Sequence, residues 1–488
     1  MATPVIEDRG LSKSRTLERT VEIFLAAVAV CLVYAAVTSM TNSFRLAREA
    51  YQFDYEEGNV LNAAVRINAG LTPYATPGSW PVVLNPYGPI PYVISARLIG
   101  SGQPEFFRPR MISLVAALII AGEIALLVQG FTGSISLGIG FAAFFLSIPL
   151  VQEWVPLLRV DLLGLAFSLG GIVVFFRLPR LHLLAWLLFA LALLCKVTFL
   201  AAPLACTAIL VRRKGWREIG LGMLTSFAVL APAVTALQWS THGAFLFHQL
   251  GTHVDAFSWM NYRNHAAVLL RQAPVLVALS LIGILRTRRL SEPSIYLLAV
   301  VLGTVTALKR GSESNHFLEL EAALCISAAI GIYELHKMKK LPLASAGLIV
   351  LCGALLATEG IANRAAYSSQ GVVNDCAQAY AFIRNHHQIL SENVGALVLT
   401  GRPVLLSNPF VYAQLVRSGK WPSGRVEQML QESKADLVII GKPSIRDQRW
   451  SQPALAALDA NYHVTKRFVC LDATLAYEPN VGPTAPPR

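Results

Sequence analysis

The residues best suited to chemistry form an acidic run, Phe53-Asp54-Tyr55-Glu56-Glu57-Gly58, directly after the first long apolar segment. Three carboxylates within four residues repel one another, and such a group can act as a general base on a hydroxyl or hold a cation. A solvated polar loop is the alternative explanation. The acids therefore have to be judged together with the other charged residues of the chain.

Three further polar groups lie at the ends of apolar segments. Arg159 and Asp161 precede one such segment, Lys196 interrupts another, and Lys309-Arg310-Gly311-Ser312-Glu313-Ser314-Asn315-His316 follows a third. Charges are costly inside a bilayer, whereas Lys and Arg at its surface pair well with phosphate. Each group also has a structural explanation: an Arg159–Asp161 pair at a helix start, a Lys196 side chain that reaches the membrane surface, or an arginine–glutamate pair.

The amino-acid composition indicates the environment in which this chain folds. Of its 488 residues 54% are hydrophobic and only 14% charged, and the mean hydropathy is +0.52. These values exclude an ordinary soluble protein, a disordered chain and a disulfide-rich secreted module. The net charge of +12 comes from short basic clusters between apolar segments, which is typical of a polytopic membrane protein.

About eleven membrane spans are expected, since roughly 20 apolar residues cross a bilayer core of ~30 Å. Segment 182–211 is expected to form two short helices that turn at Lys196. The apolar segment that follows the proline-rich 86–91 and ends at Ile99 is too short to span, and it is expected to form a helix in the membrane surface. The other nine spans are 21–40, 111–129, 134–151, 161–176, 219–237, 266–285, 293–308, 317–333 and 341–358.

The basic clusters predict the orientation. With the N-terminus inside, the clusters at 177–180, 212–214, 286–289 and 337–340 all lie on the cytoplasmic side. The chain after about Gly360 is then outside. The expected domains are a cytoplasmic segment 1–20, a membrane domain 21–359 with large external loops 41–110 and 238–265, an extracytoplasmic α/β domain 360–478, and a disordered tail 479–488.

Within the predicted α/β domain, 377–384 is expected to be an amphipathic helix, and 395–400 and 436–441 are expected to be strands. A further helix is expected from a cap at Ser423 through Lys434. Cys376 and Cys470 can form a disulfide if the compartment is oxidising, and the sequence leaves open whether they do.

No metal site is predicted. The external loop 238–265 holds four histidines, but none of them has the i, i+4 spacing of a helical zinc site. Aromatic residues between the histidines favour an amphipathic helix at the membrane surface.

Several short blocks, in order along the chain, resemble the bacterial membrane glycosyltransferases of the GT-C class. The similarity is to the group that includes the protein O-mannosyltransferases and the aminoarabinose transferase of lipid A. The blocks are 54–58, 63–74, 85–91, 159–161, 193–196 and 311–319.

The resemblance implies a membrane bundle of many spans whose first external loop carries the catalytic carboxylate. The fold expected for the whole chain is therefore an all-α polytopic membrane bundle, followed by the small C-terminal extracytoplasmic α/β domain described above. It implies transfer of a sugar from a polyprenyl-phosphate donor to an extracytoplasmic lipid, glycan or protein by inverting displacement. No cofactor is required, although a divalent metal near the acids is possible. The expected location is the bacterial inner membrane. The absence of GxGxxG and Walker motifs agrees with such a donor.

The resemblance also assigns roles by position. Asp54 is the first choice for the base, and Glu57 is the second because a family Asp-Glu pair would fall on Glu56-Glu57. Asp161 is the second acid. The remaining assignments are Lys196, Lys309 and Arg310 to the donor phosphate, and Arg159, Asn315 and His316 to the acceptor or other contacts.

Two other classes of function stay open. A transporter or flippase for a lipid-linked glycan would place charges near mid-membrane and often shows repeat symmetry, whereas the charges here gather at one face and no repeat is visible. A non-catalytic envelope scaffold would tolerate loss of the acids. A glycan ligase or polymerase shares the donor chemistry and is not separated from a transferase by sequence.

Overall fold

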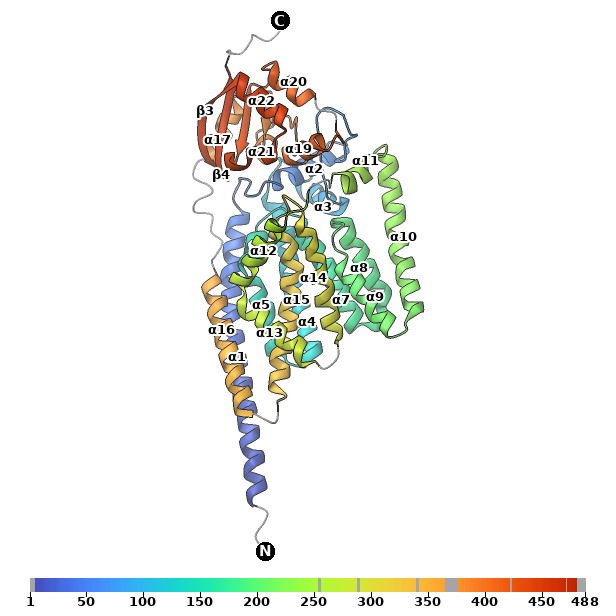
Figure 1. Ribbon diagram of the computed structural model, residues 1–488, viewed down its shortest axis with the longest axis vertical. Coiled ribbons are helices and arrows are strands. Elements are labelled where there is room, and N and C mark those ends of the chain that lie inside the picture. The colour runs from blue at the N-terminus through green and yellow to red at the C-terminus, as the bar shows by residue number, and fades with distance from the viewer. Residues whose placement is uncertain are drawn as a thin grey trace.

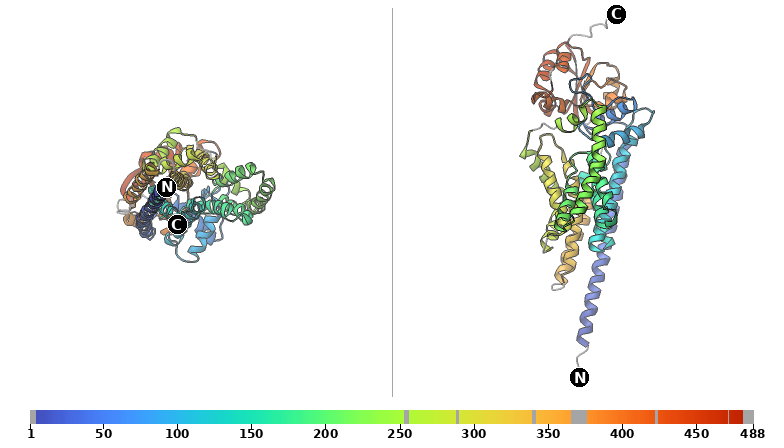
Figure 2. Two further views of the ribbon diagram at one scale, coloured as in Figure 1. Left: turned by 90° about the horizontal axis from the view of Figure 1, so that it is seen from below. Right: turned by 90° about the vertical axis from the view of Figure 1, so that its right-hand side faces the viewer.

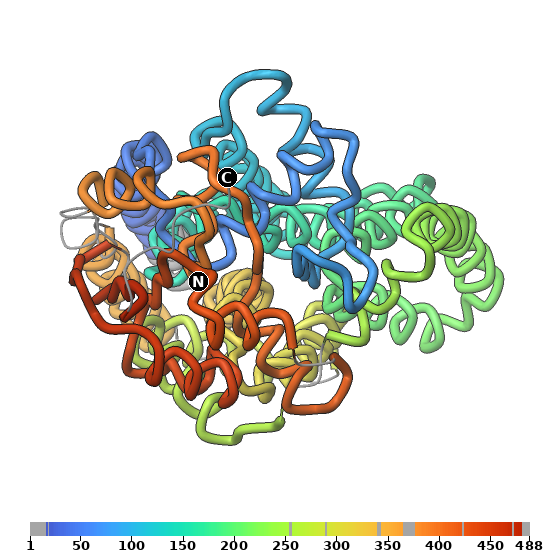
Figure 3. The backbone as a smooth tube through the Cα atoms, turned by 90° about the horizontal axis from the view of Figure 1, so that it is seen from above, coloured from blue at the N-terminus to red at the C-terminus, as the bar shows by residue number. Residues whose placement is uncertain are grey.

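The computed structural model describes residues 5–252, 256–287, 290–338, 342–364, 376–421, 424–470 and 472–480. A bundle of helices carries a small α/β domain at one end, and α1 (Val5–Ala47) runs to the opposite end of the molecule (Figure 1). The views in Figure 2 show the same elongated shape. Seen from above, the α/β domain covers only part of the bundle, and the green helices that include α10 extend beyond it (Figure 3).

The bundle is built from helices whose outward faces are apolar. Besides α1 they are α4 (Phe107–Thr132), α5 (Ile135–Ser147), α7 (Asp161–Arg177), α8 (His182–Cys195), α9 (Ala201–Arg212), α10 (Trp216–Ser240), α13 (Pro274–Arg286), α14 (Glu292–Gly303), α15 (Leu318–His336) and α16 (Pro342–Asn363). Shorter helices connect them: α2 (Glu57–Asn68), α3 (Pro89–Ile99), α6 (Pro149–Trp154), η1 (Pro179–Leu181), α11 (Ala244–Leu246), η2 (Phe247–Gly251), α12 (Trp259–Gln272), η3 (Thr304–Leu308) and η4 (Ser314–Phe317).

Helix α15 is the centre of the bundle. It is buried along most of its length and contacts α4, α5, α13, α14 and α16. Its closest partner is α13, because Gly283 and Gly331 remove the side chains at the crossing. A Cβ at Gly331 would lie 2.3 Å from the carbonyl oxygen of Leu279. Small residues at such crossings allow helix backbones to approach closely in membrane proteins.

Only some of the expected spans appear as single long helices. Among the described residues, four helices are long and apolar enough to cross a membrane, namely those over Arg19–Ala47, Phe107–Thr132, Trp216–Ser240 and Leu343–Asn363. The other apolar helices are shorter, so the count of eleven is not confirmed. The expected break at Lys196 is confirmed, since α8 ends at Cys195 and α9 begins at Ala201. The short helix expected in the apolar segment that ends at Ile99 is α3, which already begins at Pro89.

The expected span 266–285 is interrupted. Segment 266–285 is not a single helix, because α12 and α13 meet at a bend of 92°. Pro274 is the first residue of α13. Its ring excludes the helical hydrogen bond at that position and disfavours a helical conformation of Ala273, so the helix cannot continue through it.

The C-terminal domain contains one mixed sheet in the order β1-β2-β4-β3, formed by β1 (Ile389–Ser391), β2 (Leu437–Gly441), β3 (Tyr462–Cys470) and β4 (Asp472–Pro479). Strands β1 and β2 are parallel and the other pairs are antiparallel. The helices are α17 (Cys376–Arg384), α18 (Val394–Leu399), α19 (Pro409–Arg417), α20 (Arg425–Gln431), η5 (Pro443–Ile445), α21 (Arg446–Arg449) and α22 (Gln452–Asn461).

The predictions for this domain are mixed. The helix at 377–384 is α17 and the strand at 436–441 is β2. The strand expected at 395–400 is wrong, because α18 occupies Val394–Leu399. A short, fully buried apolar segment cannot be assigned by periodicity, and here Asn393 caps a helix by accepting a hydrogen bond from Ala396 N. Ser423 and residues 481–488 of the tail lie outside the described residues.

The C-terminal domain is packed against the loop region between α1 and α4. Val82 N donates to Leu405 O over 2.9 Å, and Ser407 N donates to Val82 O over 2.9 Å. Helices α2 and α18 meet at Gly58 and Gly395, where a Cβ on Gly58 would lie 2.3 Å from Gly395 N. The domain and the loop therefore form one continuous interface.

Cys376 and Cys470 form a disulfide between the start of α17 and the end of β3. The question that the sequence left open is thereby answered. The other five cysteines, Cys31, Cys195, Cys206, Cys325 and Cys352, are free.

We predict that the disulfide stabilises the C-terminal domain. Its cysteines are 94 residues apart, so reduction releases a large loop, and Cys376→Ser is expected to cost about 2–5 kcal/mol of domain stability. Limited proteolysis of the full-length protein in detergent should cleave the domain faster in this variant, whereas Cys31→Ser should not change the rate. Equal rates for Cys376→Ser and wild type would contradict the prediction.

Candidate active site

Glu57 is the most firmly held residue of the acidic run. It begins α2, is fully buried, and forms an ion pair with Arg110 of α4, with Nε–Oε1 and Nη2–Oε2 distances of 2.8 and 3.0 Å. Oε1 also accepts from Leu158 N over 2.7 Å, and Oε2 accepts from Phe53 N over 2.6 Å. Because both carboxylate oxygens are occupied, Glu57 joins the loop that contains Asp54 to the loop that contains Arg159. It does not face a cavity.

Arg110 is held just as firmly. Its guanidinium donates to the carbonyl oxygens of Glu49 and Tyr51 over 2.7 and 2.6 Å, and it lies 4.6 Å from the ring centroids of Phe53 and Phe106. A fully buried arginine needs this degree of pairing to offset its lost hydration.

A second line of charges leads away from Asp54. Asp54 Oδ1 lies 2.5 Å from Arg159 Nη1, and Arg159 Nε lies 3.5 Å from Asp161 Oδ2. Asp161 Oδ1 accepts from Lys196 Nζ and from Asn315 Nδ2, each over 2.8 Å. The structure therefore brings together residues from four blocks that are far apart in the sequence. Asp54 Oδ2 has no hydrogen bond to any described residue.

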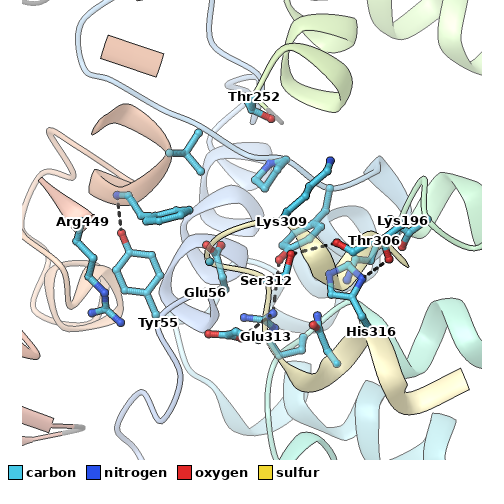
Figure 4. A pocket seen from close by; sticks show the side chains of 18 of the residues that line it. Tyr55, Glu56, Lys196, Thr252, Thr306, Lys309, Ser312, Glu313, His316 and Arg449 are labelled. Carbon is cyan, nitrogen blue, oxygen red and sulfur yellow. Dashed lines mark hydrogen bonds and ion pairs between the residues drawn. The ribbon is translucent and has the colours of Figure 1, made fainter. Parts of the chain in front are cut away.

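Arg159, Lys196 and Asn315 of this group line a cavity of about 340 Å³ at the end of the bundle beneath the C-terminal domain, and Asp54 and Asp161 are paired with residues of that lining. Figure 4 shows Lys196, Lys309 and His316 on one side, Tyr55 and Arg449 on the other, and Glu56 and Glu313 between them. The charged lining consists of five cations and two acids: Arg159, Lys196, Lys309, Lys442, Arg449, Glu56 and Glu313. Such a cavity suits an anionic group.

Glu56 and Tyr55 are held by the C-terminal domain. Asn408 Nδ2 donates to Glu56 Oε1 over 2.8 Å, and the Tyr55 hydroxyl donates to Asn408 Oδ1 and accepts from Phe410 N. Burial raises the pKa of Glu56. The Arg449 guanidinium lies 4.6 Å from the centroid of the Tyr55 ring. The domain therefore forms one wall of the cavity.

No chemical role was predicted for Glu313 from the sequence, although this residue lies within the block 309–316. Its Oε2 is 3.5 Å from Arg159 Nη2. Desolvation in the cavity, followed by the negative charge of Asp54, raises the pKa of Glu313 to about 7, while Arg159 acts in the opposite direction. A carboxyl group of this kind changes its charge near neutral pH.

His316 is held as a neutral ring. Its Nδ1 forms a 2.8 Å hydrogen bond with Thr306 Oγ1, and burial, together with the charge of Lys196, lowers its pKa well below the usual value. It can therefore form hydrogen bonds in the cavity without adding a charge.

Six of the ten predicted site residues line this cavity: Glu56, Arg159, Lys196, Lys309, Asn315 and His316. Asp54 and Asp161 do not line it, but both are paired with Arg159. Arg310 is exposed and does not line the cavity, and Glu57 is buried away from it. Lys442 and Arg449 were missed, because nothing in their local sequence marks them.

In the described part of the histidine-rich loop 238–265, His248 has a structural role. His248 is buried, accepts from Asn85 N over 3.1 Å and contacts Ala75 O over 2.8 Å. His253 and Asp255 lie outside the described residues. Among those that the structure describes, no three His, Cys, Asp or Glu side chains are grouped closely enough to hold a metal ion.

No protein-family profile and no curated protein matches this sequence. The structure resembles that of ArnT from Cupriavidus metallidurans bound to undecaprenyl phosphate, with a TM-score of 0.58, 12% identity, and coverage of 94% of this chain and 99% of that one. It also resembles the Archaeoglobus fulgidus oligosaccharyltransferase tethered with an acceptor peptide, with a TM-score of 0.58, 12% identity, and coverage of 93% and 74%. Both are GT-C glycosyltransferases, so the predicted resemblance is confirmed at the level of the fold.

We predict that the Glu57–Arg110 pair is a determinant of stability. Arg110→Leu leaves a buried carboxylate without its cation and should cost about 3–5 kcal/mol, seen as a lower thermal unfolding midpoint in detergent. The double variant Glu57→Gln/Arg110→Leu should recover part of the loss, because no buried charge remains.

The matched control is Glu105→Gln. Its ion pair with Arg108 is exposed, with 37% and 60% of the two side chains accessible, and should contribute less than about 1 kcal/mol. An Arg110→Leu protein as stable as this control would refute the structural role of the buried pair.

Proposed function

We propose that this protein is a membrane glycosyltransferase that moves a sugar from a polyprenyl-phosphate donor to an acceptor hydroxyl by inverting displacement. The observation that carries the proposal is the cationic cavity next to the Asp54 carboxylate, at the polar end of an apolar bundle. A donor of this kind has an apolar chain and a phosphate, and therefore needs both environments. The GT-C fold supports the same conclusion, since the ArnT structure is of a complex with undecaprenyl phosphate.

The donor phosphate is assigned to Lys196 and Lys309, which line the cavity. In the reaction, the bond between the anomeric carbon and the phosphate oxygen breaks, and its electron pair leaves with the phosphate. Fixed cations stabilise this developing charge. Asp161 acts as a positioning residue, because its Oδ1 fixes Lys196 and Asn315. Arg310 is not included, since it lies outside the lining.

The base is assigned to Asp54. Its Oδ1 is held by Arg159 and by Glu56 N, which leaves Oδ2 to accept the proton of the acceptor hydroxyl. The acceptor oxygen then forms the new bond to the anomeric carbon. Glu57 is not the base in this mechanism, because Arg110 and backbone donors occupy both of its oxygens.

The cavity and the C-terminal domain are assigned to the extracytoplasmic side of the bacterial inner membrane, with the N-terminus in the cytoplasm. Two independent observations support this orientation. The basic clusters follow the positive-inside rule with this topology. The Cys376–Cys470 disulfide fits an oxidising compartment.

We predict that Asp54→Asn abolishes transfer while the protein remains at wild-type levels in the membrane. Envelope glycans of a deletion strain should lack one sugar by mass spectrometry, and wild type should restore it. Asp54→Asn should not, because an amide cannot accept the proton. Full rescue by Asp54→Asn, or an unchanged glycan profile in the deletion strain, would favour a transporter or a scaffold instead.

We predict that transfer rises with pH towards a plateau above about pH 7. Arg159 is shared between Asp54 and Glu313. When Glu313 is protonated below its pKa of about 7, Arg159 has one carboxylate partner fewer, so its charge acts more strongly on Asp54 and weakens that base. The rate in membrane vesicles should therefore fall by up to about tenfold per pH unit on acidification.

Glu313→Gln mimics the protonated state and should give a low, flat pH profile in the same vesicles. The exposed residue Glu432 supplies the control, since Glu432→Gln should keep the wild-type profile. A Glu313→Gln enzyme with an unchanged rise would assign the titration to another group.

A further inference from the structure

A second cavity of about 200 Å³ adjoins the first. Tyr55, Glu313, Lys442 and Arg449 line both, so the two share a wall. The Asp54 carboxylate is part of the second lining and not of the first. The C-terminal domain supplies much of the remaining wall, from the ends of β1, β2 and β3 and from β4.

The two cavities differ in charge. The second has four acids, Asp54, Glu153, Glu313 and Glu392, against the two cations that it shares with the first. A phosphate in this cavity would face an excess of negative charge, whereas a phosphate in the first cavity would face an excess of cations.

The second cavity also offers hydrogen-bonding groups that are not fully used. Asn393 is only 8% exposed, and its Oδ1 caps α18. Among the described residues, its Nδ2 has no acceptor better than the Cys470 sulfur at 3.9 Å. The Glu153 carboxyl has no hydrogen bond to any described residue, and burial followed by the charge of Asp54 raises its pKa to about 7. Asp54 Oδ2 likewise has no hydrogen bond within the part of the chain that the structure describes. A hydroxyl-rich ligand would satisfy these groups.

We propose that this second cavity is the acceptor subsite and that it takes a phosphate-free saccharide, an assignment that rests on the proposed transferase function. A sugar hydroxyl there gives its proton to Asp54 and bonds to the anomeric carbon of the donor in the first cavity. The bond from that carbon to the donor phosphate breaks, and the electron pair leaves with the phosphate. Glu153 and Asn393 are specificity-determining residues that contact the acceptor without taking part in the bond exchange.

The test uses the full-length protein in lipid nanodiscs that contain undecaprenyl phosphate, so that the cationic first cavity is occupied and added sugars can bind only in the second. Saturation-transfer NMR measures binding of four methyl glycosides (gluco, galacto, manno and N-acetylgluco) and of the matching sugar phosphates. Glu153→Gln removes a charge, and Asn393→Asp keeps the α18 cap while removing the amide donor. Both should weaken glycoside binding by about tenfold. Glu432→Gln on the domain surface should not change it, and the sugar phosphates should bind more weakly than the glycosides.

Native mass spectrometry with undecaprenyl phosphate separates this inference from the proposed function. Binding of that lipid should be weakened by Lys309→Gln and unaffected by Glu153→Gln and Asn393→Asp. If the lipid does not bind, the proposed function fails. If it binds and depends on Lys309, three results overturn the acceptor subsite alone: no binding of any glycoside to wild type, glycoside binding that is insensitive to both variants, or sugar phosphates that bind as well as glycosides.

Discussion

The buried ion pair between Glu57 and Arg110 is the contact on which the rest of the site depends. It joins the first turn of α2 to α4, and the same carboxylate accepts from Leu158 N, next to Arg159. The loop with Asp54 and the loop with Arg159 are therefore set by one group with no accessible surface. Removing either charge would leave the other unpaired in a low-dielectric interior, so the pair keeps the loops in a single arrangement.

The C-terminal domain is a part of the site rather than an appendage to it. Gly58 and Gly395 allow α2 and α18 to touch, which brings Asn408 to Glu56 and Arg449 over Tyr55. Tyr55 and Arg449 then lie in the wall between the cationic and the acidic cavity. A change in this domain can therefore alter the second cavity while the membrane domain stays the same.

The sequence predicted those site residues whose charges flank or interrupt apolar segments. Charges at Asp54, Asp161 and Lys196 stand out against apolar segments, and the break at Lys196 follows from the cost of a charge in mid-membrane. The role of Glu57 could not be predicted, because its partner Arg110 is distant in sequence and any two apolar helices could pack together. The strand predicted at 395–400 failed for a related reason: its burial comes from contacts with residues such as Gln52 and Phe106.

Arg159 lies within ion-pair distance of Asp54, Asp161 and Glu313, so one guanidinium offsets three carboxylates. A donor phosphate held by Lys196 and Lys309 would add negative charge on the far side of Glu313. Negative charge nearby raises the pKa of a carboxylate and makes it a better proton acceptor. With the donor placed as proposed, and at a pH where Glu313 stays ionised, donor binding would strengthen the base. An acceptor hydroxyl would then be deprotonated most readily when a sugar is present to receive it.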